Sequence, residues 1–420
     1  MVVYVDVDGC VLRGLDAKRL QDYFLINNCK ITSNTKDADY IIYVSCGVDK
    51  ANVEHCLKKI NDLIATNSIV IILGCLPAII PKNKLFKLNN VVTINTNELE
   101  NIDIFFPSFK TKYNEIPLPY ETLNQTPIDY IKKKYKKEFL EILKLSFGKS
   151  LIKNIHLYNF HSRVLDKKTA FIVPSYGCNN SCAYCGIKKA VGKLRSTPKN
   201  EIINHYIELI NQGFEHFIFY ADDIGAYGMD IKETFASLIE EMDFVSKSNI
   251  TWDIFFLNPR WVLKYFDSFS SLIKKKRIVS LEIPVQHFSS TVLTNMNRIY
   301  DIKDVVQKIK YFKSLNSLLF TSTHIIFGFP NETKEDIIIA KDYLNLKIFN
   351  YIELLAYYDN PVSISYKMQG KIEEGDKIKL GYDLHEHLVK NRTLHSLNPP
   401  NIFSKNMLNL NYLLNYKAFK

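Results

Sequence analysis

The feature that most constrains the fold of this chain is a repeated alternation of short apolar segments with longer stretches of helical periodicity. In the first hundred residues we predict strands at Val2–Val7, Tyr40–Val44 and Ser68–Leu73, and helices at 16–27 and 53–65. Parallel strands need a crossover connection between them, and a helix is the usual one. Residues 1–103 are therefore predicted to form a small parallel α/β domain.

The alternation resumes near residue 169 and continues to about 365. Six strands are predicted there: Ala170–Pro174, His216–Tyr220, Thr251–Phe256, Ile278–Pro284, Phe320–Phe327 and Tyr351–Ala356. Helical stretches such as 200–212 and 301–314 separate them. We interpret 169–372 as a partial (β/α)6 barrel with its active site at the carboxyl ends of the strands. Residues 104–168 are predicted to be a basic connector, and 373–420 a mainly helical tail that ends in coil.

Composition excludes several classes of protein. The 420 residues are 47% hydrophobic and 23% charged, and no apolar run approaches the ~20 residues of a membrane helix. No basic segment precedes the apolar stretch at the N-terminus, so we expect no signal peptide. We therefore expect a cytoplasmic location. The net charge of +10 permits an RNA partner. The lysines between Lys132 and Lys137 would contact such a partner or form a solvated face.

The most specific motif is Cys178-x3-Cys182-x2-Cys185, directly after the first strand of the second region. Three thiolates can hold a [4Fe–4S] cluster and leave one iron open for catalysis. The alternatives are a zinc knuckle and a purely structural cluster. Zinc would need a fourth ligand, and the nearest downstream histidine, His205, lies on a predicted helix. We predict the open cluster.

A second set of cysteines lies at three strand ends. Cys10, Cys46 and Cys75 each follow an apolar strand of the first domain. Because parallel strands place their carboxyl ends side by side, these thiols should converge and hold a second cluster. A lone cysteine is usually an inert small apolar residue, and we interpret Cys29 and Cys56 in that way.

The spacing of the first motif, with aromatic Tyr184 before the last cysteine, resembles the radical S-adenosylmethionine (SAM) superfamily. This resemblance implies that the open iron binds the amino and carboxylate groups of SAM, and that reductive cleavage yields a 5′-deoxyadenosyl radical. Cys178, Cys182 and Cys185 would then be catalytic, and Tyr184 would lie near the adenine.

The two cysteine triads together resemble the methylthiotransferases over roughly 1–100 and 169–390. Further similar segments are Ala38–Cys46, Leu194–Pro198, Ala221–Asp230, Ile283–Ser290, Leu293–Arg298 and Ile325–Thr333. The resemblance implies two [4Fe–4S] clusters, with Cys10, Cys46 and Cys75 holding the auxiliary one. It also implies SAM contacts from Tyr184, Asp222, Gln286 and Gly328.

The chain also departs from the family pattern. Ile187-Lys188 and Val191-Gly192 replace the usual Ile-Pro and Arg-Gly, and Asp222 replaces a common glutamine. Asp253 stands where the protein-modifying branch tends to carry arginine. Only about 30 residues follow residue 390, too few for the C-terminal TRAM β-barrel of the family, so we expect that domain to be missing.

The function implied is insertion of a methylthio group at an unactivated C–H bond. Gln286-His287 resembles the branch that acts on a ribosomal-protein aspartate, whereas Gly177–Asn180 resembles the tRNA-adenosine branch. Without a TRAM domain we favour a peptide or protein side chain, for example in a ribosomally made peptide, over tRNA. The remaining alternatives are a thioether-forming or oxidising peptide maturase and a silent paralogue that binds RNA or protein. A monomer served by a flavodoxin or ferredoxin, without a membrane partner, is expected.

Overall fold

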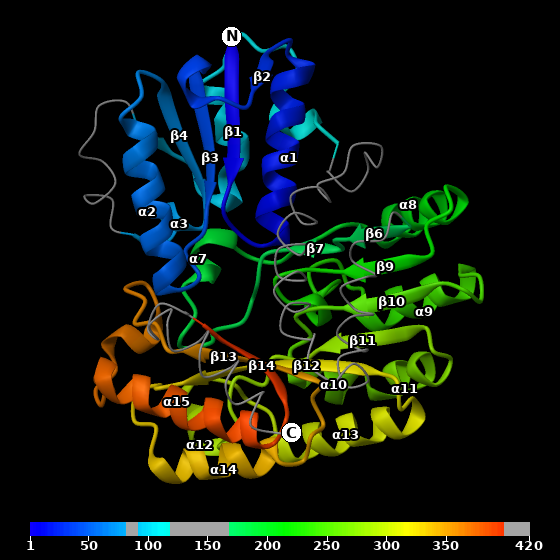
Figure 1. Cartoon of the computed structure of the whole chain (residues 1–420). Coiled ribbons are helices and arrows are strands. Elements are labelled where there is room, and N and C mark those ends of the chain that lie inside the picture. The colour runs from blue at the N-terminus through cyan, green and yellow to red at the C-terminus, as the bar shows by residue number, and fades with distance from the viewer. Residues whose placement is uncertain (81–90, 118–167, 399–420) are drawn as a thin grey trace, which may run out of the picture.

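The N-terminal domain is a parallel sheet covered by helices. The computed structural model describes residues 1–80, 91–117 and 168–398 (Figure 1). In strand order β2-β1-β3-β4-β5, the five strands are Lys30–Thr32, Val2–Val7, Tyr40–Ser45, Ile69–Gly74 and Val91–Thr93, and every pairing is parallel. Helices α1 (Val11–Ile26), α2 (Lys50–Ile64) and α3 (Leu76–Ile79) follow β1, β3 and β4. The central strands are buried on both faces, which explains their unbroken apolar sequence.

Part of the segment interpreted as a connector packs on this domain. The 3₁₀ segments η2 (Thr96–Ile104) and η3 (Tyr113–Glu115) follow β5, and Tyr113 and Ile116 are buried in the domain core. Arg19 on α1 donates hydrogen bonds to the carbonyls of Tyr113 and Ile116. The lysine run at 132–137 lies outside the described residues.

The second region forms a seven-stranded parallel sheet in the order β14-β13-β12-β11-β10-β9-β6. Its strands, in chain order, are β6 (Thr169–Ile172), β9 (His216–Phe219), β10 (Thr251–Ile254), β11 (Ile278–Glu282), β12 (Phe320–Phe327), β13 (Tyr351–Ala356) and β14 (Leu394–Asn398). The covering helices are α8 (Lys199–Asn211), α9 (Phe235–Val245), α10 (Pro259–Lys264), α11 (Phe266–Lys274), α13 (Ile302–Leu315), α14 (Lys334–Leu344) and α15 (Glu374–Lys390). The predicted α/β fold class, with a parallel N-terminal domain followed by a partial barrel, is confirmed.

The tail was predicted to pass from helix into coil, but residues 394–398 form a strand, and residues 399–420 lie outside the described residues. After α15 the chain returns to the sheet and adds β14 beside β13 as a seventh, edge strand. Its five residues, Leu-His-Ser-Leu-Asn, carry too little apolar alternation to indicate a strand. None of the helices in the described ranges is long and apolar enough to cross a bilayer.

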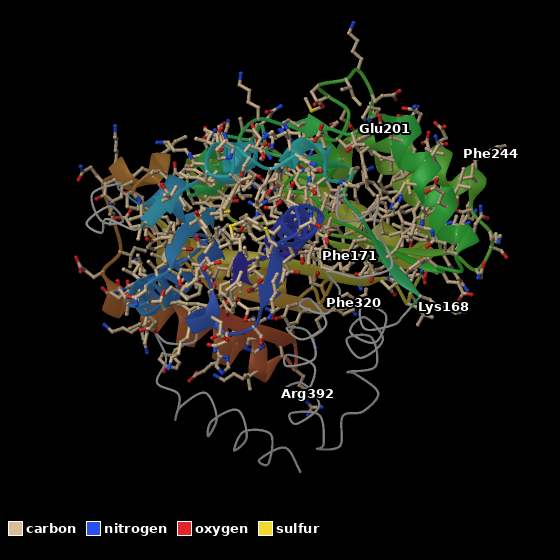
Figure 2. The ribbon with its side chains drawn as sticks, turned by 90° about the horizontal axis from the view of Figure 1, so that it is seen from above. Lys168, Phe171, Glu201, Phe244, Phe320 and Arg392 are labelled. Atoms are coloured by element: carbon tan, nitrogen blue, oxygen red, sulfur yellow. The ribbon has the colours of Figure 1, made fainter. Side chains whose placement is uncertain are left out.

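The two sheets meet through the first turn of α1. Val11, Leu12 and Leu15 form one buried cluster with barrel residues that include Phe171 and Phe320. Figure 2 looks down on the molecule from above and shows Phe171 and Phe320 near this helix. The N-terminal domain therefore covers one side of the barrel, and Cys10, which begins α1, lies where the two parts meet.

Candidate active site

The first set of cysteines is assembled by the register of the N-terminal sheet. Cys46 and Cys75 directly follow β3 and β4, and the Cys75 amide donates to the Ser45 carbonyl at 2.9 Å. Gly74 makes this approach possible. Its φ is +100°, and a Cβ there would lie 2.2 Å from the Ser45 oxygen. Cys10, in the loop between β1 and α1, is near enough to raise the pKa of both thiols.

The three thiols influence one another. Burial raises the pKa of Cys46, and the neighbouring Cys75 and Cys10 raise it further. Burial also raises the pKa of Cys75 to about 11, against the opposing effect of Arg13. The structure thus brings together the three cysteines that the sequence assigned to an auxiliary site. We name Cys10, Cys46 and Cys75 the strand-end triad.

An arginine that sequence reasoning missed lies against this triad. Arg13 is only 1% exposed, and its Nη1 donates to the Cys75 Sγ at 3.5 Å. Its Nε lies 2.8 Å from Oδ2 of Asp16, one helical turn further along α1. The available signal was a single arginine in the otherwise apolar turn that follows Cys10.

The other triad lies within one loop. Cys178, Cys182 and Cys185, which we name the loop triad, connect β7 (Ser175–Tyr176) to α7 (Ile187–Val191). Burial raises the pKa of Cys178 to about 12 and that of Cys185 to about 11, and Asp223 and Cys182 respectively add to the effect. The Cys178 amide donates to the Gly192 carbonyl at 3.1 Å, which closes the loop.

Polar side chains that the sequence did not single out hold the loop triad. Arg298 is 7% exposed, and its Nη1 donates to the Cys182 Sγ at 3.7 Å while its Nη2 donates to the Pro284 carbonyl at 2.6 Å. Asn180 Nδ2 lies 3.3 Å from the Cys178 Sγ and 2.7 Å from Oδ2 of Asp223. Each triad therefore has a buried arginine directed at one of its sulfur atoms.

Three of the four residues assigned to SAM binding lie at the carboxyl ends of strands or beside the loop triad. Tyr184 precedes Cys185 and packs against a buried apolar cluster. Gln286 follows β11 with a φ of +67°, and its buried Oε1 has no hydrogen-bond partner among the described residues. Gly328 directly follows β12, where a Cβ would lie 2.6 Å from Cγ of Lys377. An unpaired buried amide oxygen is suited to a ligand donor.

The fourth, Asp222, lies between the two triads. Its Oδ2 accepts a hydrogen bond from the Gly177 amide at 2.8 Å, next to Cys178. Burial raises the pKa of Asp222, and Arg13 from the other domain opposes this. The Asp222 charge in turn raises the pKa of thiols in both triads. The two sets of cysteines thus face a common acid.

The wall of the barrel lumen carries charged groups below the triads. Neighbours of Glu282, His324 and Glu353 along their strands belong to the outer core, so these three side chains point to the opposite, inner face. His324 Nε2 lies 3.5 Å from Oε2 of Glu282 and 3.3 Å from Oε2 of Glu353. Burial alone would lower the pKa of His324, but the two carboxylates outweigh it and raise it to about 9.

The donor chemistry of the triads fits iron–sulfur clusters. In the described parts of the chain no three His, Cys, Asp or Glu side chains form a group that could hold a single metal ion. His205, the candidate zinc ligand, lies on α8. A four-iron cluster differs because each cysteine binds its own iron, and three thiols beside a buried cation suit such an anionic group.

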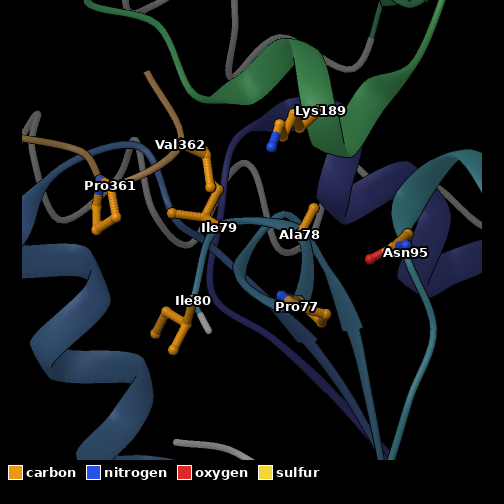
Figure 3. Close-up of a pocket in the computed structure, with 8 residues that line it drawn as sticks. All are labelled: Pro77, Ala78, Ile79, Ile80, Asn95, Lys189, Pro361 and Val362. Atoms are coloured by element: carbon orange, nitrogen blue, oxygen red, sulfur yellow. The ribbon is translucent and has the colours of Figure 1, made fainter. Parts of the chain in front are cut away.

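A pocket of about 430 Å³ opens where the domains meet (Figure 3). It is lined mainly by apolar side chains of α3 and the loop after β13, with Lys189 of α7 at its rim. One of its lining residues, Ile79, packs with Cys75 and with Ala190 of α7 in a small buried cluster. The pocket therefore adjoins the strand-end triad.

Comparison with known families gives two matches. Residues 172–344 match the radical SAM superfamily, and residues 2–96 match a family described as uncharacterized protein family UPF0004. Among solved structures, the radical SAM methyltransferase TsrM from Kitasatospora setae, with cobalamin and a [4Fe–4S] cluster bound, aligns with a TM-score of 0.58 at 11% identity. That alignment covers 87% of this chain and 76% of the solved one, and it shows a shared fold. The chain is thus a radical SAM enzyme.

Similar proteins indicate the type of radical SAM enzyme. A ribosomal protein uS12 methylthiotransferase, RimO of Clostridium botulinum, is 28% identical over 88% of this chain and 78% of its own length. A probable threonylcarbamoyladenosine tRNA methylthiotransferase of Pyrococcus horikoshii is 26% identical over 79% of this chain and 71% of its own length. A tRNA-2-methylthio-N(6)-dimethylallyladenosine synthase of Thermosipho melanesiensis is 26% identical over 87% of this chain and 77% of its own length. The family matches and these relatives support an enzyme of the radical SAM methylthiotransferase family, as its cysteine pattern predicted.

The cofactors of this family are two [4Fe–4S] clusters and SAM, which when bound supply a 5′-deoxyadenosyl radical and a site for sulfur. We assign one cluster to the loop triad and the auxiliary cluster to the strand-end triad. The chain's own contribution is to hold each set of thiols beside a buried arginine, with the buried Asp222 near both sets.

Proposed function

We propose that this enzyme inserts a methylthio group at an unactivated C–H bond of a peptide or protein side chain. The observation that supports the proposal is the position of Asp222, which accepts a hydrogen bond from Gly177 beside the loop triad and is near enough to the strand-end triad for its charge to raise the pKa of Cys75. A radical formed beside the loop triad and sulfur held at the strand-end triad would then act on one substrate carbon without a large movement of the chain.

The charge of the barrel lumen supports a peptide over a nucleic acid. Two carboxylates, Glu282 and Glu353, lie within 3.5 Å of His324, so this part of the inner wall is acidic. The buried Asp253 on β10 adds a further acid, which pairs with His216 at 3.0 Å. A phosphate would be repelled here, whereas a peptide with a neutral or cationic neighbour would not.

The Gln286-His287 pair supports the same branch indirectly. His287 is 1% exposed, and its Nε2 lies 2.9 Å from Oε1 of the buried Glu332. Glu332 also accepts a hydrogen bond from the Gly328 amide. His287 therefore holds together the loops that carry Gln286 and Gly328. Similarity to the uS12-modifying relative is consistent with this arrangement.

The test is mass spectrometry of cellular peptides and of tRNA nucleosides from cells with and without the gene. We expect a peptide that carries an added CH2S unit only when the gene is present. A methylthioadenosine nucleoside that vanishes with the gene would overturn the peptide assignment and leave the methylthiotransferase assignment intact. A peptide that loses two hydrogens would instead indicate an oxidising or thioether-forming maturase.

Binding of bulk tRNA provides an independent check. A tRNA substrate needs many phosphate contacts, and each lowers the affinity by roughly 0.7–0.9 log units per log unit of salt. A peptide bound in extended form depends on backbone pairing and side-chain pockets, and its affinity should vary little with salt. We expect weak binding of tRNA at physiological salt. Tight, steeply salt-dependent binding would contradict the proposal.

A further inference from the structure

Arg13 is a buried cation whose nearest partners belong to the strand-end triad and to α1. Its side chain is enclosed where the N-terminal domain meets the barrel, with Nη1 at the Cys75 Sγ and Nε at Asp16. A charge that is removed from water in this way is costly unless opposite charge surrounds it. The groups placed to supply that charge are Asp16, Asp222, Cys75 and Cys10, and the two cysteines supply it only as thiolates, the form in which they bind a metal.

Two of these four groups are ligands of the auxiliary cluster in our assignment. A [4Fe–4S] cluster in its oxidised form, bound by three thiolates, carries a net charge of about −1, and reduction by one electron makes it more negative. A fixed positive charge that also donates N–H···S to a ligand sulfur stabilises the reduced form more than the oxidised form. Arg13 has this position. It lies in the first turn of α1, and this helix starts directly after the ligand Cys10.

We propose that Arg13 is a positioning residue that raises the reduction potential of the cluster held by Cys10, Cys46 and Cys75. The inference rests on the assignment of these cysteines in the proposed function. The electron itself comes from the external one-electron donor that also serves the loop-triad cluster, and Arg13 supplies only the compensating charge. Asp222 faces Arg13 and moderates its field, so the two side chains act on the potential in opposite directions.

The experiment isolates the auxiliary cluster in the full-length chain. With Cys178, Cys182 and Cys185 replaced by alanine, anaerobic reconstitution should give about four irons per chain. Redox titration followed by electron paramagnetic resonance then measures one cluster. We expect Arg13→Gln to retain the iron and to lower the midpoint potential. Arg13→Lys, which keeps the charge and loses the planar guanidinium, should lower it less.

Arg19→Gln is the matched control. Arg19 lies on the same helix but donates to the Tyr113 and Ile116 carbonyls, so its loss should leave the potential unchanged. An unchanged potential in Arg13→Gln with full iron would overturn the inference, as would an equal fall in Arg13→Lys. Loss of the cluster from Arg13→Lys would also overturn it, because the charge is retained.

A separate result tests the assignment beneath the inference. Full-length chain with Cys10, Cys46 and Cys75 replaced by alanine should lose the auxiliary cluster. If that variant keeps all its iron, the ligands are wrong and the proposed function fails with them. If it loses the cluster while Arg13→Gln leaves the potential unchanged, only the role of Arg13 is wrong.

Discussion

The two triads present the same three thiols and are built in different ways. The loop triad lies within eight residues, 178–185, of one loop. The strand-end triad is spread over 10, 46 and 75 and exists only because three parallel strands end side by side. Each nevertheless has a buried arginine directed at a sulfur, Arg13 or Arg298. The comparison teaches that sequence spacing can fix one cluster site, whereas the other depends on the register of a sheet.

The largest effect is expected from the loop triad. Replacing Cys178, Cys182 and Cys185 together by alanine should abolish cleavage of SAM, because these thiols hold the iron that binds it. Iron should fall from about eight to about four per chain after anaerobic reconstitution. Chromatographic detection of 5′-deoxyadenosine measures cleavage. Retained cleavage would show that the loop triad is not the catalytic one.

The corresponding change in the strand-end triad should separate the two sites. With Cys10, Cys46 and Cys75 replaced by alanine, 5′-deoxyadenosine should still form, since this triad lies in another domain. Methylthiolated product should disappear from the mass spectrum of the reaction. If the product persists, the strand-end triad is not the route of sulfur.

The dependence on register can be tested with two glycines. Gly74→Ala places a Cβ 2.2 Å from the Ser45 oxygen, and Gly177→Ala places one 2.1 Å from the Lys193 oxygen, both at positive φ. Each should cost about 2 kcal/mol or more in unfolding free energy. Gly74→Ala should lower the iron held by the strand-end triad, and Gly177→Ala that held by the loop triad. Each glycine variant is made in both triple-alanine backgrounds, so that the iron held by one triad is measured without the other. An equal loss of iron from both triads in either variant would contradict the dependence on register.

The smallest effect concerns pH and the barrel below the loop triad. The pKa of His324 is raised from 6.5 to about 9, with Glu282 and Glu353 outweighing burial and Arg298. Its stabilisation is therefore complete below pH 6.5 and is lost as the pH rises through 9. His324→Gln should cost about 2 kcal/mol at pH 6 and almost nothing near pH 10. Thermal melts at both pH values measure the difference, and a cost that does not change with pH would exclude this role.

The sequence predicted the strands and both triads because apolar runs and cysteine spacing are local signals. It placed the start of α1 at residue 16, whereas the helix begins at Val11. Apart from Arg13 that first turn is apolar, and it packs against the barrel and has no solvent-facing polar side, so its periodicity gives no helical signal. Arg13 and Arg298 were missed for a related reason. Their importance comes from which sulfur atoms lie beside them in the fold.

The sequence also could not predict which groups lie near Asp222. Its hydrogen bond with Gly177 and its electrostatic interaction with Arg13 join segments more than forty and two hundred positions apart, respectively. β14 was missed because an edge strand forms from the backbone of its neighbour and needs little apolar alternation of its own. Local sequence patterns therefore predicted the two triads separately, whereas their common neighbour, Asp222, is defined only by the packing of the two sheets.

The insertion of α1 into the barrel has a consequence for biosynthesis. The N-terminal domain leaves the ribosome first, with Val11, Leu12 and Leu15 exposed at the start of its first helix. The barrel strands that cover them, from Phe171 to Phe320, are made much later. During that interval the nascent chain carries a bare apolar helix end beside reduced cysteines. The apolar end of α1 is therefore covered only once the barrel strands that extend to Phe320 have been made.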